Sequence, residues 1–141
     1  MTNIKSKAEW AVHYQKMGLS IIPVGANKKP LISSWKEYQE KPASLEQVKE
    51  WWDMWPEANL ALVTGKVSGI VALDLDKKHN RSSKEFQIPA TASAKSGNGG
   101  EHFFFKHPGA AVETRAAIDG PGVDIRGDSG YILLAPSIND T

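Results

Sequence analysis

The feature of this sequence that most restricts its fold is a change of hydrophobic period near residue 58. Before it, apolar residues recur at helical spacing in two segments, 5–17 and 45–55, with a short buried strand at 19–24 between them. After it, six short segments read as strands with a period of two, and Gly, Pro, Ser or Asn stands in most of the gaps. Helices first and strands later predict an α+β domain rather than the strict alternation of a parallel βαβ sheet.

The second helix has the clearest boundaries. Ser44 is a favourable N-cap with Gln47 three residues later, and Pro56 ends the helix. Its apolar stripe contains Trp52 and Trp55, so we interpret these tryptophans as core residues rather than as base-stacking platforms. The expected strands of the second part are 59–64, 69–76, 91–95, 101–106, 122–126 and 131–135.

Composition excludes several classes of protein. With 141 residues the chain has the length of one domain, which we divide into an amino-terminal part, 1–58, and a strand-rich part, 59–138. It contains no cysteine, which excludes a disulfide framework, a thiolate nucleophile, an iron–sulfur cluster and a cysteine-type zinc site. The polar start is not a signal peptide, and no stretch approaches the ~20 apolar residues of a membrane span. We therefore expect a cytoplasmic protein without a membrane partner.

The charge is nearly balanced but unevenly distributed. Lys and Arg number 17 and Asp and Glu 16, a balance that argues against a general nucleic-acid coat protein. The segment 77–106, however, carries six basic and two acidic residues. Segments 51–76 and 107–141 on either side of it are acidic. This pattern is consistent with carboxylates that hold cations beside a basic segment that faces phosphates.

The first candidate site is the strand 69–76, Gly-Ile-Val-Ala-Leu-Asp-Leu-Asp. Alternate residues of a strand share a face, so Asp74 and Asp76 lie on one face about 6.6 Å apart. Two carboxylates so placed repel each other unless water or a cation lies between them, and paired hard oxygens suit Mg²⁺ or Mn²⁺. The alternative is the end of a strand that runs into a solvated loop, where acidic residues are common.

The second candidate, 96–106, joins a glycine-rich turn to a strand that carries His102. Glycines let backbone N–H groups approach an anion closely, and His102, Phe104 and Lys106 share a face of the strand. A histidine and a lysine beside such a turn suit a triphosphate. The segment is neither a Walker A loop nor a dinucleotide fingerprint, and the alternative is an ordinary β-hairpin with an exposed histidine.

The third candidate is 120–137, in which Asp124 and Arg126 share one face of a short strand. A third carboxylate with an adjacent arginine would complete a metal site and supply a phosphate contact. The alternative is a surface ion pair worth about 0–1 kcal/mol. Asp128 is interpreted as a turn residue that serves the backbone.

Two further groups of residues have no clear role. Lys28 and Lys29 are candidates for contacts with template or phosphate, but turn lysines are usually solvated. His13, His79 and His107 show no pattern of partners and are assigned no role.

Each segment alone is ambiguous, but their order is specific. Asp-x-Asp, then Gly-Gly-x-His, then Val-Asp-Ile-Arg-Gly resembles the three motifs of the primase–polymerase family, within the archaeo-eukaryotic primase superfamily. The similarity extends over about residues 8–138. It includes the opening strand and lysine-rich turn at 22–31, the tryptophan-rich lead-in at 51–65, and the Leu-Ala-Pro-Ser sequence at 134–137.

The resemblance implies a fold and a reaction. The fold is α+β, with a mostly antiparallel, RRM-like catalytic palm sheet over 59–135 and the amino-terminal helices packed on or beside it. The reaction is DNA-templated nucleotidyl transfer, in which a primer 3′-oxygen attacks the α-phosphorus of a dNTP or NTP on a single-stranded DNA template. The resemblance implies that two Mg²⁺ or Mn²⁺ ions assist this step. The residues so implied are Asp74, Asp76 and Asp124 for metal, His102 for catalysis and the triphosphate, Ser96, Gly97 and Gly100 for the phosphate-facing turn, and Arg126 for the nucleotide.

The resemblance also implies a setting. Members of the family act in phage, plasmid or other mobile-element DNA replication, with a helicase or a C-terminal priming domain in the same or an associated chain. Because they normally continue beyond the position of Ser137, we expect the sequence to be C-terminally truncated. Two alternatives remain at this point: a catalytically weak module that binds nucleotide or single-stranded DNA, and a nucleotide-sugar glycosyltransferase that uses Asp-x-Asp for its metal.

Overall fold

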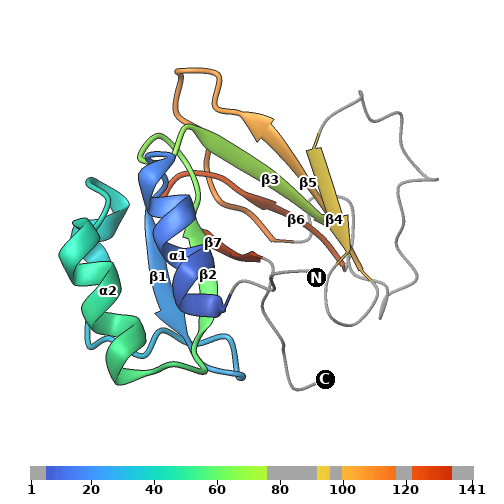
Figure 1. The fold of residues 1–141 in the computed structure, drawn as a ribbon. Helices are drawn as coiled ribbons and strands as arrows, with labels where there is room; N and C mark the ends of the chain where they lie inside the picture. Colours follow the sequence, from blue (N-terminus) through green and yellow to red (C-terminus); the bar gives the residue numbers. More distant parts are fainter. Residues whose placement is uncertain (1–5, 76–91, 96–99, 117–121, 135–141) are drawn as a thin grey trace.

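The computed structural model describes residues 6–75, 92–95, 100–116 and 122–134 (Figure 1). The helical elements are α1 (Lys7–Lys16), the 3₁₀ helix η1 (Lys36–Gln39) and α2 (Leu45–Met54). The strands are β1 (Ile21–Val24), β2 (Asn59–Val63), β3 (Ile70–Leu75), β4 (Ala92–Lys95), β5 (Glu101–Lys106), β6 (Val123–Arg126) and β7 (Tyr131–Leu134). The predicted α+β class and all seven predicted strands are confirmed, and at the described ends their bounds agree within two residues. The predicted strand ends at 76, 91 and 135 lie outside the described residues.

Both long helices begin at a serine cap. The Ser44 hydroxyl accepts a hydrogen bond from the Gln47 backbone N–H at 3.1 Å, as the sequence predicts. At α1, Ser6 accepts from the Glu9 N–H at 3.1 Å, and the Glu9 carboxylate accepts from the Ser6 N–H at 3.3 Å. This reciprocal pair satisfies two backbone donors that a helix start leaves without partners.

The strands form two antiparallel sheets rather than the single central sheet expected for 59–135. One has the order β1-β2-β7 and the other β4-β5-β3-β6. The chain changes sheet between β2 and β3 and returns between β6 and β7. Two of the expected palm strands, β2 and β7, therefore pair with each other, and β2 also pairs with β1. Alternation in the sequence identifies strands but not their partners, because pairing joins segments that are far apart in the chain.

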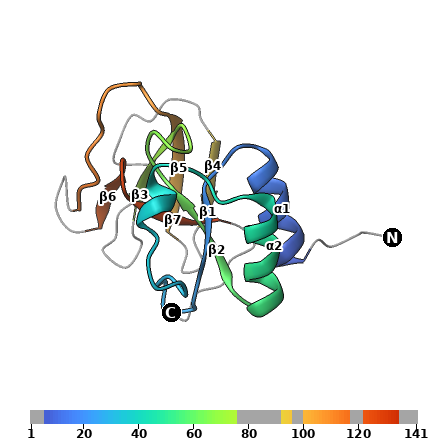
Figure 2. The same ribbon diagram turned by 90° about the vertical axis from the view of Figure 1, so that its left-hand side faces the viewer.

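The three-stranded sheet lies in the middle of the molecule. Helices α1 and α2 lie to one side of β1 and β2, and β3 and β6 lie to the other (Figure 2). Every residue of β1 and β2 is therefore buried, although a strand covered on one face alone would show alternating burial. Ala72 of β3 belongs to the same core, and Phe104 of β5 packs against it.

The tryptophans of α2 lie where the sequence predicts. Trp51 and Trp52 are buried in the core, and the Trp52 indole N–H donates to the Ala58 carbonyl at 3.1 Å. Trp55 is half-buried and packs against the same core. Within the part of the chain that the structure describes, neither helix has the length and apolar character needed to cross a membrane.

Asp128 joins the segments at the point where the chain passes from β6 back to β7. Its carboxylate accepts hydrogen bonds from the backbone N–H groups of Lys66 and Val112, each at 2.9 Å. The His107 ring approaches it through Nε2 at 3.1 Å, and His107 Nδ1 accepts from the Gly109 N–H at 3.0 Å, which leaves the ring proton on Nε2. Asp128 therefore fixes the turn that follows β6, and with it the end of a site-bearing strand.

Candidate active site

The pairing of three strands brings the predicted site residues together. Asp74 of β3 lies opposite His102 of β5 on one side and opposite Asp124 of β6 on the other. Partners in an antiparallel register point to the same face, so all three side chains share a face of the sheet. Ala72 and Phe104 are on that face as well, and because they pack into the core, the site lies on the side of this sheet that faces the three-stranded sheet.

Asp74 and His102 form the best-enclosed pair of the site. His102 Nε2 lies 3.3 Å from Asp74 Oδ1, and the two side chains are 10% and 24% exposed. Asp74 is a carboxylate, which only accepts hydrogen bonds, so the contact places a proton on His102 Nε2. The ring of His102 also meets Phe104 edge-on, with centroids 6.4 Å apart, which restricts its orientation. The alternative of an exposed hairpin histidine is therefore wrong.

Arg126 lies between the two carboxylates. Its Nη2 is 3.3 Å from Asp124 Oδ2 and 3.7 Å from Asp74 Oδ2. Its Nε atom is buried and has no hydrogen-bond partner in the structure described here. The arginine thus joins two strands electrostatically and is more than the isolated surface pair with Asp124 that the sequence left open.

The surroundings of Asp74 keep it ionised. Burial raises the pKa of this carboxyl, but the hydrogen bond and charge of His102 and the charges of Arg126 and Lys28 outweigh it, so the pKa is lowered. Asp74 is therefore negatively charged at neutral pH, the state that a cation requires.

Lys28, one of the two turn lysines that the sequence offers as candidates, acts on this site from the turn after β1. It follows β1, has a left-handed backbone with φ of 67°, and accepts a hydrogen bond at its carbonyl from the Tyr131 hydroxyl at 2.8 Å. Tyr131 is packed edge-on against Trp35, with ring centroids 5.1 Å apart. The lysine side chain is exposed, and its charge has the smallest of the effects that lower the pKa of Asp74.

The donors present suit a hard divalent cation. Asp74 and Asp124 offer carboxylate oxygens from adjacent strands, and such ligands are those that Mg²⁺ and Mn²⁺ prefer. Among the described residues no group of three acidic or histidine side chains is placed to hold an ion. The predicted third ligand, Asp76, lies outside the described residues, as do Ser96 and Gly97. Gly100 is described, and it is buried directly before β5.

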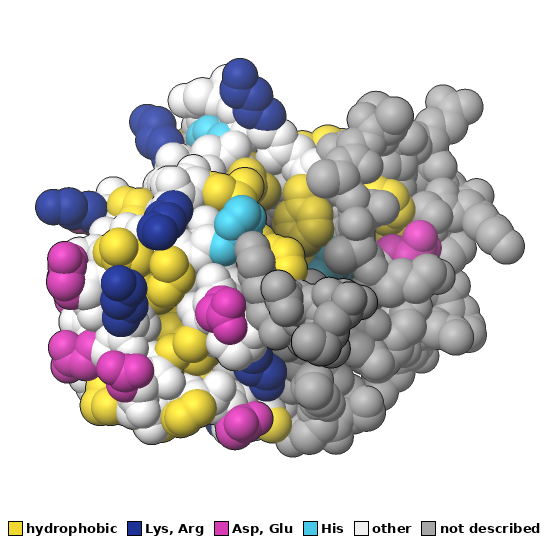
Figure 3. Space-filling view, viewed as in Figure 1, with side chains coloured by type: hydrophobic (Ala, Val, Ile, Leu, Met, Phe, Trp, Pro, Cys, Tyr) yellow, Lys and Arg dark blue, Asp and Glu magenta, His cyan; other side chains and the backbone are white. Residues whose placement is uncertain are grey.

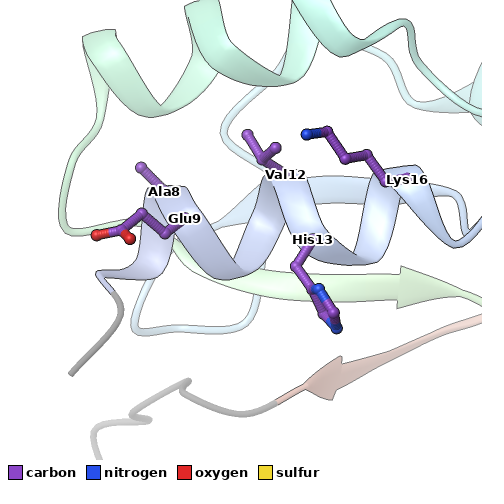
Figure 4. A pocket seen from close by; sticks show the side chains of 5 residues that line it. All are labelled: Ala8, Glu9, Val12, His13 and Lys16. Carbon is purple, nitrogen blue, oxygen red and sulfur yellow. The ribbon is translucent and has the colours of Figure 1, made fainter. Parts of the chain in front are cut away.

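The helical side of the molecule carries charge of both signs. In Figure 3, basic and acidic side chains are interspersed over the left-hand part, where Figure 1 shows α1 and α2. An open pocket of about 390 Å³ lies along α1 and is lined by Ala8, Glu9, Val12, His13 and Lys16 (Figure 4). All five residues come from one helix and none is a predicted site residue, so the pocket is separate from the site built on β3, β5 and β6.

A comparison with protein families agrees with the motif order. A search of curated proteins found no match. The family model described as "Bifunctional DNA primase/polymerase, N-terminal" matches residues 11–141, which include the whole of the site described above. This match covers nearly the full chain, and the chain therefore belongs to the bifunctional DNA primase/polymerase N-terminal (Prim-Pol) family.

Proposed function

We propose that this domain catalyses DNA-templated nucleotidyl transfer with two divalent ions, in the replication of a phage, plasmid or other mobile element. The observation that carries the proposal is the register that sets Asp74 between His102 and Asp124 on one face of a sheet. Family membership supports the class of reaction. The glycosyltransferase alternative accounts for Asp-x-Asp but gives no role to His102 and Asp124, which lie opposite Asp74 on the two neighbouring strands.

The carboxylates have the role of metal ligands in this proposal. Asp74 and Asp124 would hold Mg²⁺ or Mn²⁺, together with Asp76. When bound, the ions would lower the pKa of the attacking hydroxyl and neutralise charge on the leaving pyrophosphate. The lowered pKa of Asp74 supports this role, because an ionised carboxylate needs no proton displaced before it binds a cation.

The cationic and donor groups have the role of phosphate contacts. His102 Nε2 faces the Asp74 carboxylate, and an Nε2 that carries a proton is a donor suited to a phosphate oxygen. Arg126 and Lys28 add positive charge from β6 and from the turn after β1. Gly100, with Ser96 and Gly97, would bring backbone donors to the same triphosphate.

Primer extension tests the proposal. The full chain is incubated with a primed single-stranded template, dNTPs and Mn²⁺, and Asp74→Asn and Asp124→Asn are compared with Asp53→Asn, an exposed carboxylate on α2. We expect the first two to lose at least ~100-fold in rate, as removal of a charged transition-state contact does, and the third to match the wild type. Equal activity of all variants would contradict the proposal, and nucleotide binding without extension would indicate the binding-module alternative.

A further inference from the structure

One guanidinium nitrogen lies within ion-pair distance of both carboxylates of the site. Arg126 Nη2 approaches Oδ2 of Asp124 at 3.3 Å and Oδ2 of Asp74 at 3.7 Å. Asp74 and Asp124 face each other across adjacent strands, and like charges so placed destabilise a sheet unless a cation lies between them. In this structure the arginine is that cation.

We propose that Arg126 is a resident counter-ion of the two carboxylates, that divalent ions displace it, and that the displaced guanidinium then binds a phosphate of the nucleotide. The proposal rests on the function proposed above. It assigns Arg126 two successive partners rather than a fixed contact with the nucleotide.

Displacement follows from competition for the same oxygens. A Mg²⁺ ion binds carboxylate oxygens at about 2.1 Å and holds its ligands in a nearly octahedral arrangement. A guanidinium nitrogen within 4 Å of both oxygens places a positive charge beside the position that such an ion would take, and this charge repels the ion. The arginine and the ion therefore compete for these two oxygens.

The present contacts of Arg126 are weak enough to exchange. Both N···O separations exceed the about 2.7–2.9 Å of a strong charge-assisted hydrogen bond, and both use the same nitrogen. The side chain is one-third exposed, so a path for movement is open.

The unused donor of Arg126 indicates its second partner. Nε is buried and has no hydrogen-bond partner in the described structure, a costly state for an N–H group. Nε and Nη2 form one edge of the guanidinium fork, which matches two oxygens of a phosphate. A triphosphate beside the carboxylates would satisfy both donors at once.

Direct measurement of Mn²⁺ binding tests the first step. Free Mn²⁺ is titrated by electron paramagnetic resonance with the full chain, without nucleotide, for wild type, Arg126→Gln, Arg126→Lys and Arg115→Gln. Arg115 is an exposed arginine that pairs through its backbone with Ile125 of β6, and its replacement removes the same charge from a side chain without an ion pair among the described residues. Arg126→Gln should bind Mn²⁺ on the order of tenfold tighter, whereas Arg126→Lys and Arg115→Gln should stay near the wild type. Unchanged or weaker binding by Arg126→Gln would overturn the proposal.

Nucleotide binding at saturating Mn²⁺ tests the second step. In calorimetric titration with dATP, Arg126→Gln and Arg126→Lys should bind the nucleotide roughly tenfold or more weakly than the wild type and Arg115→Gln do. Neither glutamine nor lysine has the two parallel N–H donors of the guanidinium fork. If Arg126→Gln does not fold, as circular dichroism would show, Arg126→Lys still tests the proposal through its near-normal Mn²⁺ affinity and weak dATP binding. A dATP affinity unchanged in both variants would contradict the phosphate contact.

The two proposals can fail separately. A chain that shows the Mn²⁺ effect but extends no primer would contradict the proposed function and still support the counter-ion role of Arg126.

Discussion

Asp74 is the site residue whose pKa is lowered by three neighbouring basic side chains. His102, Arg126 and Lys28 all act on it, and they come from β5, β6 and the turn after β1. Two of these partners follow from strand pairing, so the sequence motifs could predict them. The sequence names Lys28 only as a candidate for template or phosphate contacts. Its effect on Asp74 could not be predicted, because its position depends on the turn after β1 and on the Tyr131 hydroxyl, more than 100 residues away.

The pKa of Asp74 should respond to Lys28 but not to its neighbour. We predict that Lys28→Ala raises the Asp74 pKa, because a positive charge that favours the carboxylate is lost. Lys29→Ala, an exposed lysine in the same turn, serves as the matched control. Carboxyl carbon chemical shifts followed by NMR from about pH 2 to 7 measure both. Equal Asp74 titration curves in the two variants would show that Lys28 does not act on the site.

Asp74 should also make the stability of the fold depend on acid pH. Its folded pKa lies below the ordinary value of 3.8, so its contribution to stability is complete above pH 3.8 and is lost as the pH falls through the folded pKa. Asp74→Asn lacks this group. We therefore predict that the free energy of unfolding of wild type falls more steeply below pH 3.8 than that of Asp74→Asn. Parallel urea-denaturation curves for the two proteins across that range would contradict the account.

At the scale of elements, the site depends on how β6 is held beside β3. The outer edge of β6 pairs with Arg115 through two backbone hydrogen bonds of 2.8 and 2.9 Å at Ile125, and the turn after it is fixed by Asp128. The sequence predicted Asp128 as a turn residue but assigned His107 nothing. The contact between His107 and Asp128 could not be predicted, because the two residues are 21 positions apart in the chain and meet only in the folded protein.

Asp128→Asn should destabilise the fold. The carboxylate accepts from three N–H groups, and an amide has one acceptor oxygen and would turn an NH₂ group toward the other donors. We predict a loss of about 1–3 kcal/mol in the free energy of unfolding at pH 7, against almost none for Asp53→Asn. The Val112 N–H, together with the Lys66 N–H and His107, lowers the pKa of Asp128 against a smaller effect of burial. The loss should therefore shrink below the ordinary pKa of 3.8, and a loss that is the same at pH 7 and pH 2.5 would argue against the carboxylate as its cause.

A substitution at Gly65 tests how closely the turn between β2 and β3 packs against the turn between β6 and β7. Its φ is +100°, and a Cβ there would lie 2.5 Å from the Asp128 Cα. Gly69 has a φ of +72° but nothing within 4 Å of its Cβ position, so Gly69→Ala measures backbone strain alone. We predict that Gly69→Ala costs about 1 kcal/mol and that Gly65→Ala costs at least ~2 kcal/mol more, measured by chemical denaturation. Equal costs would show that the turns are not packed as described.

At the scale of the whole molecule, the amino-terminal layer is part of the construction of the site. The sequence predicts each of the described strands, but the family resemblance implies one palm sheet over 59–135, whereas β2 and β7 pair beside β1. This pairing places β1, β2 and β7 beside the face that carries the candidate site, and the turn after β1 carries Lys28, whose charge lowers the pKa of Asp74. The motif order predicted that Asp74, His102 and Asp124 lie together, and the register of β3, β5 and β6 places them on one face, whereas the predicted Asp76 lies outside the described residues. The enclosing second sheet depends on long-range pairing, which a local pattern does not encode.

A crystal structure of the full chain with Mn²⁺ and a non-hydrolysable dATP analogue, in which anomalous scattering locates the metal, would show directly whether Asp74 and Asp124 hold the ion. We predict Mn²⁺ at about 2.2 Å from carboxylate oxygens of both Asp74 and Asp124, with the triphosphate against His102 Nε2 and Arg126 turned away from the carboxylates. Nucleotide bound with Mn²⁺ elsewhere, while Arg126 still joins Asp74 to Asp124, would contradict the account.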